Sequence, residues 1–237
     1  MKNKVFTLLS IFILASSFTF AQRKELRKKK QIDKYSKYDS MKMYSGFFNF
    51  FYNTENDHIY LEVSDLEKEF LYVNSLSEGI GSNDIGLDRG QLGNSRVVYF
   101  KKAGNRLLLV EPNQKYRANS ENYLEKKSIK QAFAKSVIWS FPIIDKNNNK
   151  IIIDLNDFLL NDAHGVSQRL KLRNQGSYLV DKSRSSMSID RTKAFPKNIE
   201  FDVQLTFKGQ PKGNLIKSVT PSADAVTVHQ HHSFIDL

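Results

Sequence analysis

Alternation between apolar and polar residues is the feature that most constrains the fold of this chain. A period of two places successive side chains on opposite faces of a strand, so each such run predicts a strand with one buried face. Polar segments at 53–57, 103–105 and 145–150 separate neighbouring runs and predict antiparallel hairpins. The runs are Phe47–Tyr52, His58–Val63, Phe70–Leu76, Arg96–Lys102, Arg106–Glu111, Val137–Ile143, Ile151–Asp154, Ser185–Asp190, Glu200–Lys208 and Ala225–Ile235.

Two segments depart from this alternation and predict helices. Residues 120–135 carry apolar side chains near the helical period, with Ser120 or Asn122 as the N-cap. A shorter helix is predicted from Asn156 to about Leu170. We therefore expect an α+β fold, predominantly antiparallel β-sheet with one or two helices packed on it.

The N-terminus has the pattern of a secretory signal peptide. A basic head, Met1–Lys4, precedes an apolar stretch, and Thr19 and Ala21 supply small residues before a cleavage site at Gln22. The stretch is short for a membrane span, although a retained signal anchor is the alternative. We predict a signal peptide at 1–21, a basic flexible leader at 22–40 and a β-rich domain at 41–237, with no transmembrane span after cleavage. The protein is expected to be exported: periplasmic, outer-envelope-associated or extracellular.

Composition limits how such an exported chain is stabilised and what it binds. It contains no cysteine, so stability must come from an apolar core, for which 40% hydrophobic residues are sufficient. The net charge is +11, but residues 1–34 hold nine Lys/Arg against two acidic residues, which leaves only +4 for the rest. This distribution and the expected export argue against nucleic acid as a partner. A solvated leader, or a salt-sensitive contact with an anionic envelope surface, explains the basic tract.

The stretch Gly79–Gly93 contains five glycines and predicts a loop of one required shape between two strands. It lacks the Gly-Lys-Ser/Thr ending of a P-loop and the compact spacing of a dinucleotide-binding turn. We interpret it as an ordered connection in which Asp84, Asp88 and Arg89 satisfy local backbone or each other. Its candidate site residues, whose role and possible ligand the sequence leaves open, are Gly81, Ser82, Asn83, Asp84, Gly86, Asp88, Arg89 and Gly90.

Metal sites and nucleophiles have weaker support in the sequence. Strand alternation places His229 and His231 on one face and His232 on the other, so the first two are weak candidates for metal ligands, without an identifiable third. The segment from Asp145 resembles a calcium loop only superficially, because its sixth position is Lys150 rather than glycine. There is no cysteine nucleophile and no G-x-S-x-G motif.

Several longer motifs resemble the N-terminal domain of unknown function of large secreted bacterial zinc-dependent metallopeptidases, over about residues 40–237. They are Ser45–Phe50, Glu69–Ser75, Gly81–Gly93, Asp157–Gly165, Gln175–Tyr178, Thr192–Asn198 and Gln230–Phe234. In that family the catalytic H-E-x-x-H lies downstream, and this chain contains no such motif. The resemblance implies zinc for a missing catalytic domain, a downstream metallopeptidase domain of the same polypeptide as partner, and a peptide or protein substrate. No cofactor is expected for this chain, and the domain is expected to be truncated at its C-terminal end.

The leading hypothesis is a non-catalytic N-terminal module, a scaffold or substrate-presenting region, of an exported zinc-dependent metallopeptidase. We expect no catalysis by this chain alone. One alternative is a stand-alone secreted envelope module that binds peptide or glycan through the glycine loop and exposed aromatics such as Phe48, Phe50 and Tyr52. Another is an independent metal-binding protein centred on His229 to His232.

Overall fold

The computed structural model describes residues 38–147 and 149–237. Contacts within the chain separate two units, residues 1–42 and 43–237, and the second unit contains the core described below. The predicted signal peptide and most of the predicted leader lie outside the described residues. No helix in the described part of the chain is long and apolar enough to cross a membrane.

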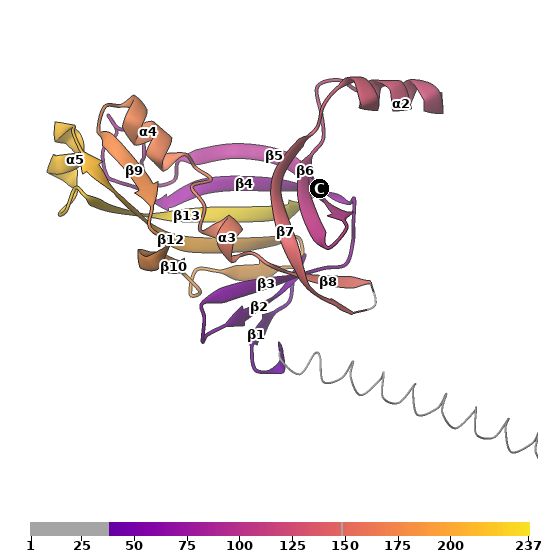
Figure 1. Ribbon diagram of the computed structural model, residues 1–237, viewed down its shortest axis with the longest axis horizontal. Helices are drawn as coiled ribbons and strands as arrows, with labels where there is room; N and C mark the ends of the chain where they lie inside the picture. Colours follow the sequence, from indigo (N-terminus) through magenta and orange to yellow (C-terminus); the bar gives the residue numbers. More distant parts are fainter. Residues whose placement is uncertain (1–37, 148) are drawn as a thin grey trace, which may run out of the picture. The chain divides into compact units, whose positions relative to one another are not determined.

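The expected α+β fold with predominantly antiparallel sheet is confirmed (Figure 1). All ten predicted strands are present, and three short ones, β1, β9 and β11, had no clear alternation in the sequence. The strands are β1 (Lys42–Tyr44), β2 (Asn49–Asn53), β3 (His58–Val63), β4 (Glu69–Glu78), β5 (Leu92–Ala103), β6 (Arg106–Glu111), β7 (Ser136–Asn147), β8 (Lys150–Asp154), β9 (Gly176–Val180), β10 (Ser186–Met187), β11 (Lys193–Phe195), β12 (Asn198–Pro211) and β13 (Ala225–Asp236).

The helices are short. They are α2 (Tyr123–Ala132), α3 (Asn156–Leu159), α4 (Val166–Leu172) and α5 (Asn214–Val219), with the 3₁₀ turn η1 (Lys182–Arg184). The single helix predicted over 156–170 was wrong, because α3 ends at Leu159 and α4 begins only after Gly165, whose φ of 80° is not helical. The Asp162 carboxylate then accepts hydrogen bonds from the first backbone N–H groups of α4. Of the two caps predicted for α2, Asn122 is the one observed, and its side-chain oxygen accepts from Leu124 N at 2.9 Å.

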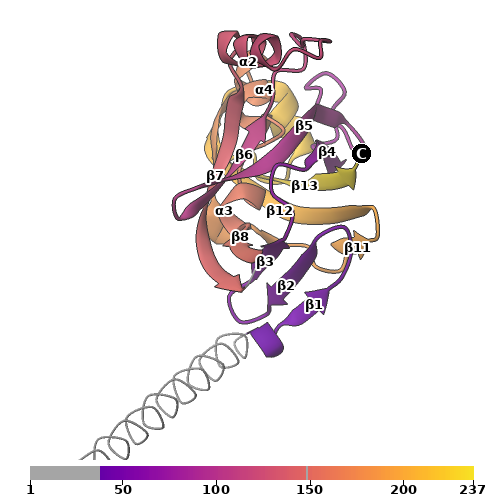
Figure 2. The same cartoon turned by 90° about the vertical axis from the view of Figure 1, so that its right-hand side faces the viewer.

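The strands form one antiparallel sheet that turns around β7. Its order is β1-β2-β3-β8-β7-β6-β5-β4-β13-β12-β10, with β9 and β11 also paired to β12. β7 pairs with β6 through its first half and with β8 through its second half, which allows the sheet to curl (Figure 2). The ring of Phe50 in β2 lies 5.1 Å from that of Phe201 in β12, so strands distant in the order face each other across the core.

The predicted hairpins at 53–57, 103–105 and 145–150 are confirmed, since each joins two antiparallel partners. Alternating burial along β4 and β13 shows that these strands present one face to the core, as their sequence pattern predicts. The last strand, β13, lies inside the sheet, where it pairs with β12 on one side and β4 on the other. The edge of this strand is therefore covered.

Aromatic side chains fill the core inside the curled sheet. Phe158 of α3 contacts the rings of Tyr72, Trp139, Phe141 and several other residues, which fixes α3 against the inner face of the sheet. The expectation that Phe48 and Phe50 are exposed was wrong, because both are buried in this core. Packing against other aromatic rings, rather than ligand binding, accounts for their presence.

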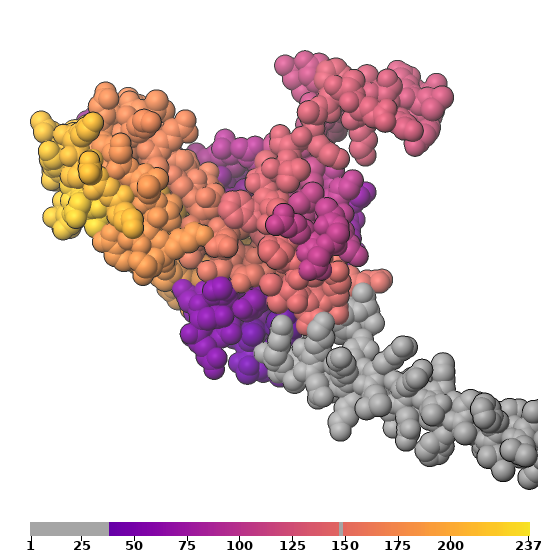
Figure 3. Space-filling model, viewed as in Figure 1, coloured from indigo at the N-terminus to yellow at the C-terminus, as the bar shows by residue number. Residues whose placement is uncertain are grey.

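One segment projects from this body. Residues 112–135, which we call the arm, connect β6 to β7 and contain α2, none of whose residues is buried (Figures 1 and 3). The pair Glu111 and Ser136 closes the β6–β7 ladder beneath the arm. The arm is thus a long hairpin connection that stands away from the sheet.

Candidate functional site: a histidine–carboxylate network beside a motif junction

The glycine loop folds back on itself in a fixed shape. Ile80 N donates to Leu87 O at 2.8 Å, and the backbone of Leu87 lies so close to Gly79 that a Cβ there would be 2.2 Å from its oxygen. Ile85 and Leu87 are buried in the core cluster, which anchors the loop to the domain. The predicted ordered shape agrees with these contacts.

The charged residues of the loop behave differently from the expectation. The side chains of Asp84, Asp88 and Arg89 make no hydrogen bond or ion pair with another residue in 38–147 or 149–237, whereas we expected them to satisfy local backbone or each other. The Ser82 carbonyl instead accepts from two backbone N–H groups, those of Ile85 and Gly86. The loop closes through its backbone, so the three charges are not needed for its shape.

Four of the sequence motifs meet at one junction. Gln230 of β13 is fully buried, and its Oε1 accepts from His164 N at 2.9 Å while its Nε2 donates to Asn161 O at 2.8 Å. Asn74 of β4 donates to Ala163 O at 3.3 Å. A Cβ at Gly93 would lie 1.8 Å from the Asn74 Oδ1. The junction therefore holds the loop before α4 against β4, β5 and β13.

His232 belongs to the same junction and faces the core. Its Nδ1 lies 2.9 Å from the Tyr72 hydroxyl, and its Nε2 lies 2.9 Å from Gln230 Nε2 and 3.2 Å from Leu159 O. Complete burial lowers the pKa of His232 to about 3, so this imidazole is neutral at physiological pH. Burial also lowers the pKa of His164. His232 is thus a neutral hydrogen-bonding group of the framework, whereas His164 contributes its backbone N–H and has a buried Nδ1 without a hydrogen-bond partner among the described residues.

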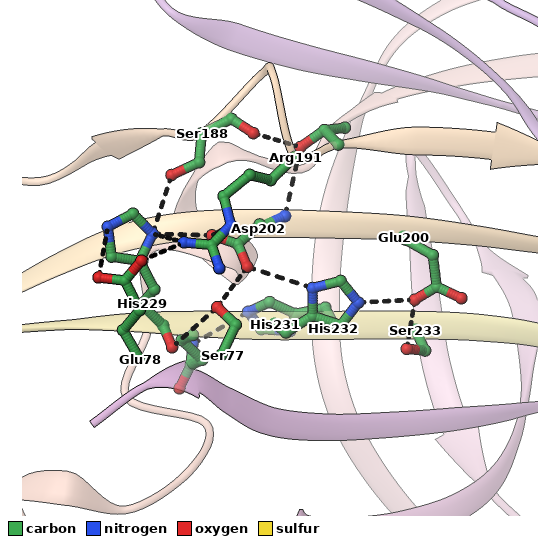
Figure 4. A network of polar contacts seen from close by, with 12 residues as sticks. Ser77, Glu78, Ser188, Arg191, Glu200, Asp202, His229, His231, His232 and Ser233 are labelled. Carbon is green, nitrogen blue, oxygen red and sulfur yellow. Dashed lines mark hydrogen bonds and ion pairs between the residues drawn. The ribbon is translucent and has the colours of Figure 1, made fainter. Parts of the chain in front are cut away.

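The opposite face of β13 carries a charged network centred on Asp202 of β12 (Figure 4). The register of β12 and β13 pairs Asp202 with His231, and the Asp202 side chain is only 1% exposed. Its Oδ1 lies 2.9 Å from His229 Nδ1, and its Oδ2 lies 3.3 Å from His231 Nδ1. Ser77 of β4 donates to the same Oδ2 at 2.5 Å. Two strands, β13 and β4, therefore supply the partners of one buried carboxylate on β12.

His231 bridges two carboxylates. Its Nε2 lies 2.8 Å from Glu200 Oε2, and Ser233 Oγ also donates to that oxygen. The hydrogen bonds to Asp202 and Glu200 raise the pKa of His231 to about 9, so it is an imidazolium at neutral pH. Burial opposes ionisation of Asp202, but the hydrogen bonds from His231, Ser77 and His229 outweigh it and lower the pKa of Asp202 to about 2.

Arg191 completes the network at its exposed side. Its Nη1 donates to Glu78 Oε1 at 2.5 Å, and its Nε lies 3.9 Å from Asp202 Oδ1. The hydrogen bond to Glu78 raises the pKa of Arg191. Glu78 Oε2 is also 3.7 Å from His229 Nε2. Positive and negative side chains thus alternate, and every ionised group described here has an opposite charge beside it.

A serine, a histidine and an aspartate occur together in this network, but not in the order of a catalytic triad. Ser188 Oγ lies 3.2 Å from His229 Nδ1, which is the same nitrogen that contacts Asp202. In a triad the aspartate hydrogen-bonds to one ring nitrogen and orients the imidazole. The serine hydroxyl hydrogen-bonds to the other ring nitrogen, which takes up its proton. This geometry therefore does not activate Ser188 as a nucleophile.

The structure brings together some of the predicted site residues and separates others. His229 and His231 share one face of β13 and His232 lies on the other, as alternation predicted. None of the loop residues from Gly81 to Gly90 contributes a side chain to the network. Within residues 38–147 and 149–237, no three His, Cys, Asp or Glu side chains are arranged to hold a metal ion.

Sequence reasoning missed the acidic partners of the histidines. Glu200 and Asp202 alternate on β12 as His229 and His231 do on β13, which is a visible pattern in the sequence. Recognising it required the pairing of β12 with β13 in this register. Ser77, Glu78 and Arg191 had no local signal at all, since they come from β4 and from the turn before β11.

A cavity of about 650 Å³ lies elsewhere, between the arm and the body. Its body wall includes Glu67, Glu69 and Tyr99, and burial together with these two glutamates raises the pKa of Tyr99. Its arm wall includes Ile129 and Phe133 of the α2 segment. No local sequence pattern indicated this cavity, because its two walls are far apart along the chain.

The fold and the network define an antiparallel β protein with an ionic cluster around one buried carboxylate on one sheet face and a polar junction on the other. This chain belongs to the family described as Domain of unknown function (DUF5117), which matches residues 90–237. Residues 29–79 match a second family, Domain of unknown function (DUF5118). Searches of the curated proteins and of the solved structures found no significant match. β4 and β5 pair across the boundary between the two matches, so both contribute to one sheet.

Proposed function

We propose that this chain is a non-catalytic module, a scaffold or substrate-presenting region, of an exported zinc-dependent metallopeptidase. The observation that carries the proposal is the junction of motif residues described above. Asn74, Gly93, His164, Gln230 and His232 stand in motifs that resemble the metallopeptidase-associated domain. The side chains of Asn74 and Gln230 hydrogen-bond to the backbone of residues 161–164, and Gly93 leaves room for the Asn74 side chain, so the junction holds backbone segments together inside the domain.

The chemistry of the histidines supports a structural role for these motifs. A hydrolytic zinc site uses neutral imidazoles that project into a water-filled cleft and leave one metal position open. His231 is instead charged between two carboxylates, and His232 is neutral but completely buried. Zinc and its general base would be supplied by the downstream metallopeptidase domain, and no residue of this chain is assigned to that step.

The experiment compares this chain with the product of the reading frame that continues beyond Leu237. We expect the purified chain to leave casein intact, and the longer product to digest casein in a manner abolished by EDTA and restored by zinc. Removing residues 41–237 from the longer product should lower its rate on casein more than its rate on a short fluorogenic peptide. EDTA-sensitive digestion of casein by the purified chain alone would contradict the proposal.

A stand-alone envelope module that binds peptide or glycan is the second candidate, and the cavity beside the arm favours it. In this case binding of peptide or glycan is measurable with the chain by itself. The glycine loop is less suited to this role, because its apolar side chains Ile85 and Leu87 point into the core. The two candidates therefore differ in whether activity requires a further domain.

A further inference from the structure

The arm carries the net charge of the folded body. Residues 35–237 contain 27 Lys/Arg and 23 Asp/Glu, a net charge of +4. The arm, residues 112–135, holds six Lys/Arg and two Glu, which is also +4. The remainder of residues 35–237 is therefore neutral. A charge concentrated on one projecting segment creates a local positive potential that attracts an anionic partner.

The basic side chains of the arm gather at the cavity. Arg117, Lys126, Lys130 and Lys135 all line it, and none forms an ion pair with a carboxylate in the described part of the chain. Lys126 and Lys130 are four residues apart, so they lie on the same face of α2. This differs from the network around Asp202, in which each charge already has a partner.

Apolar groups lie between these charges. Ile129 and Phe133 face the cavity from the α2 segment, and the ring of Phe133 stacks on that of Tyr116 at 4.0 Å. The cavity volume of about 650 Å³ falls within the range of about 300–1,000 Å³ that is typical of ligand sites. An apolar floor beneath separated cations suits a polypeptide that carries both an apolar side chain and carboxylates.

The cavity wall formed by the body carries acidic side chains, which can bind groups that the basic arm wall cannot. Glu67 and Glu69 line it, and Glu67 has φ 61°, an uncommon backbone conformation for this residue. These two carboxylates repel phosphate or sulfate groups, so a ligand that carries such groups along its whole length is disfavoured. They can accept hydrogen bonds from N–H groups. An extended peptide presents carboxylates on one side and backbone amides on the other, and it matches both walls.

We propose that the cavity between the arm and the body binds an acidic polypeptide segment, with an apolar side chain over Ile129 and Phe133 and carboxylates toward Lys126 and Lys130. This inference goes beyond the proposed function and does not depend on the metallopeptidase assignment. The test of this inference measures peptide binding by this chain, whereas the proposed function is tested by measuring proteolysis with a longer product. Failure of one therefore leaves the other intact.

The probe is a short fluorescein-labelled peptide of aspartate, glutamate and leucine, and its binding to the mature chain is followed by fluorescence anisotropy. Its counterpart has lysine in place of every acidic residue. We expect the acidic peptide to bind and the lysine peptide not to bind. The double variant Lys126→Glu/Lys130→Glu should weaken binding about tenfold, because each reversal turns an attraction near the protein surface into a repulsion.

The matched control is Lys127→Glu/Lys171→Glu, which makes the same change in net charge at two exposed lysines outside the cavity. It should alter binding by less than about twofold, as expected for screened charges at a distance. For the apolar contact, Ile129→Ser should weaken binding, whereas Leu124→Ser, on the same helix but outside the cavity, should not. Circular dichroism spectra and melting temperatures verify that all variants are folded.

Three outcomes would overturn the proposal. The first is equal binding of the acidic and lysine peptides, and the second is an equal loss of affinity in both double variants. The third is binding of the chain to phosphatidylglycerol vesicles without binding of the acidic peptide, which would identify the arm as a membrane-surface contact. A selective loss in Lys126→Glu/Lys130→Glu and Ile129→Ser supports the site.

Discussion

The bridge formed by His231 makes stability depend on pH in a direction that can be worked out. His231 has a pKa of about 9 in the folded protein and an ordinary value of 6.5 when unfolded. A group whose folded pKa is raised contributes stability that is complete below pH 6.5 and is lost as the pH rises through about 9. At about 1.4 kcal/mol per pH unit, this difference corresponds to at most about 3 kcal/mol.

Solvent reduces that upper value. The His231 side chain is 25% exposed, and its attraction to Asp202 is the same interaction that lowers the pKa of Asp202, so it is counted once. We expect wild-type protein to lose about 2 kcal/mol of unfolding free energy between pH 6.5 and 9.5. His231→Gln should be less stable than wild type by about that amount at pH 6 and nearly equal to it at pH 9.5.

The assay is urea denaturation followed by tryptophan fluorescence at half-unit intervals from pH 6 to 9.5. His58→Gln is the matched control, because it also removes an imidazole beside a carboxylate, the Asp154 side chain at 2.7 Å, but leaves the network intact. This variant should keep the alkaline loss of stability. A loss in His231→Gln as steep as that in wild type would refute the assignment to His231.

Two further predictions concern the framework and the arm. Gly93→Ala should lower the unfolding free energy by about 3 kcal/mol, because its Cβ would displace the buried Asn74 oxygen 1.8 Å away. Gly90→Ala has open space but φ 81° and should cost only about 1 kcal/mol, so equal losses in urea denaturation would contradict the junction. Replacing residues 113–134 with a short glycine–serine linker should change stability by less than about 1 kcal/mol, since α2 buries nothing. A loss above about 3 kcal/mol in thermal or urea denaturation would show that the arm supports the core.

Local sequence patterns were sufficient to predict most of the strands, but they did not predict every strand and helix. The bounds of β3 and β6 were predicted to the residue, because both have a buried face and flanking turn residues. β1, β9 and β11 have little alternation of their own, and both β9 and β11 pair with the long strand β12. Residues 156–170 form two helices rather than the one predicted, because the Asp162 carboxylate caps a new helix start at Val166 and Gly165, at φ 80°, is not helical.

The candidate site could be predicted only in part from the sequence. The shared face of His229 and His231 follows from alternation within one strand. Their chemistry depends instead on Asp202, which is 29 residues from His231 and reaches it through the register of β12 and β13. A pair of histidines considered alone resembles a metal site, whereas here His231 is held between the carboxylates of Glu200 and Asp202. Long-range pairing therefore decides which of these two chemistries the histidines have.

Packing in the core explains the sequence of most of the chain but not the sequence of the arm. Glu111 and Ser136 close the β6–β7 ladder, so a tight turn between them would complete the hairpin without residues 113–134. Tyr123 and Leu124 are 71% and 70% exposed, and no residue of α2 enters the core. A helix with exposed apolar and basic side chains gains little stability from propensity alone, since helical stability in proteins comes mainly from tertiary packing. The composition of the arm therefore fits the proposed contact with an acidic polypeptide, and the cavity at its base presents both apolar and basic side chains to such a partner.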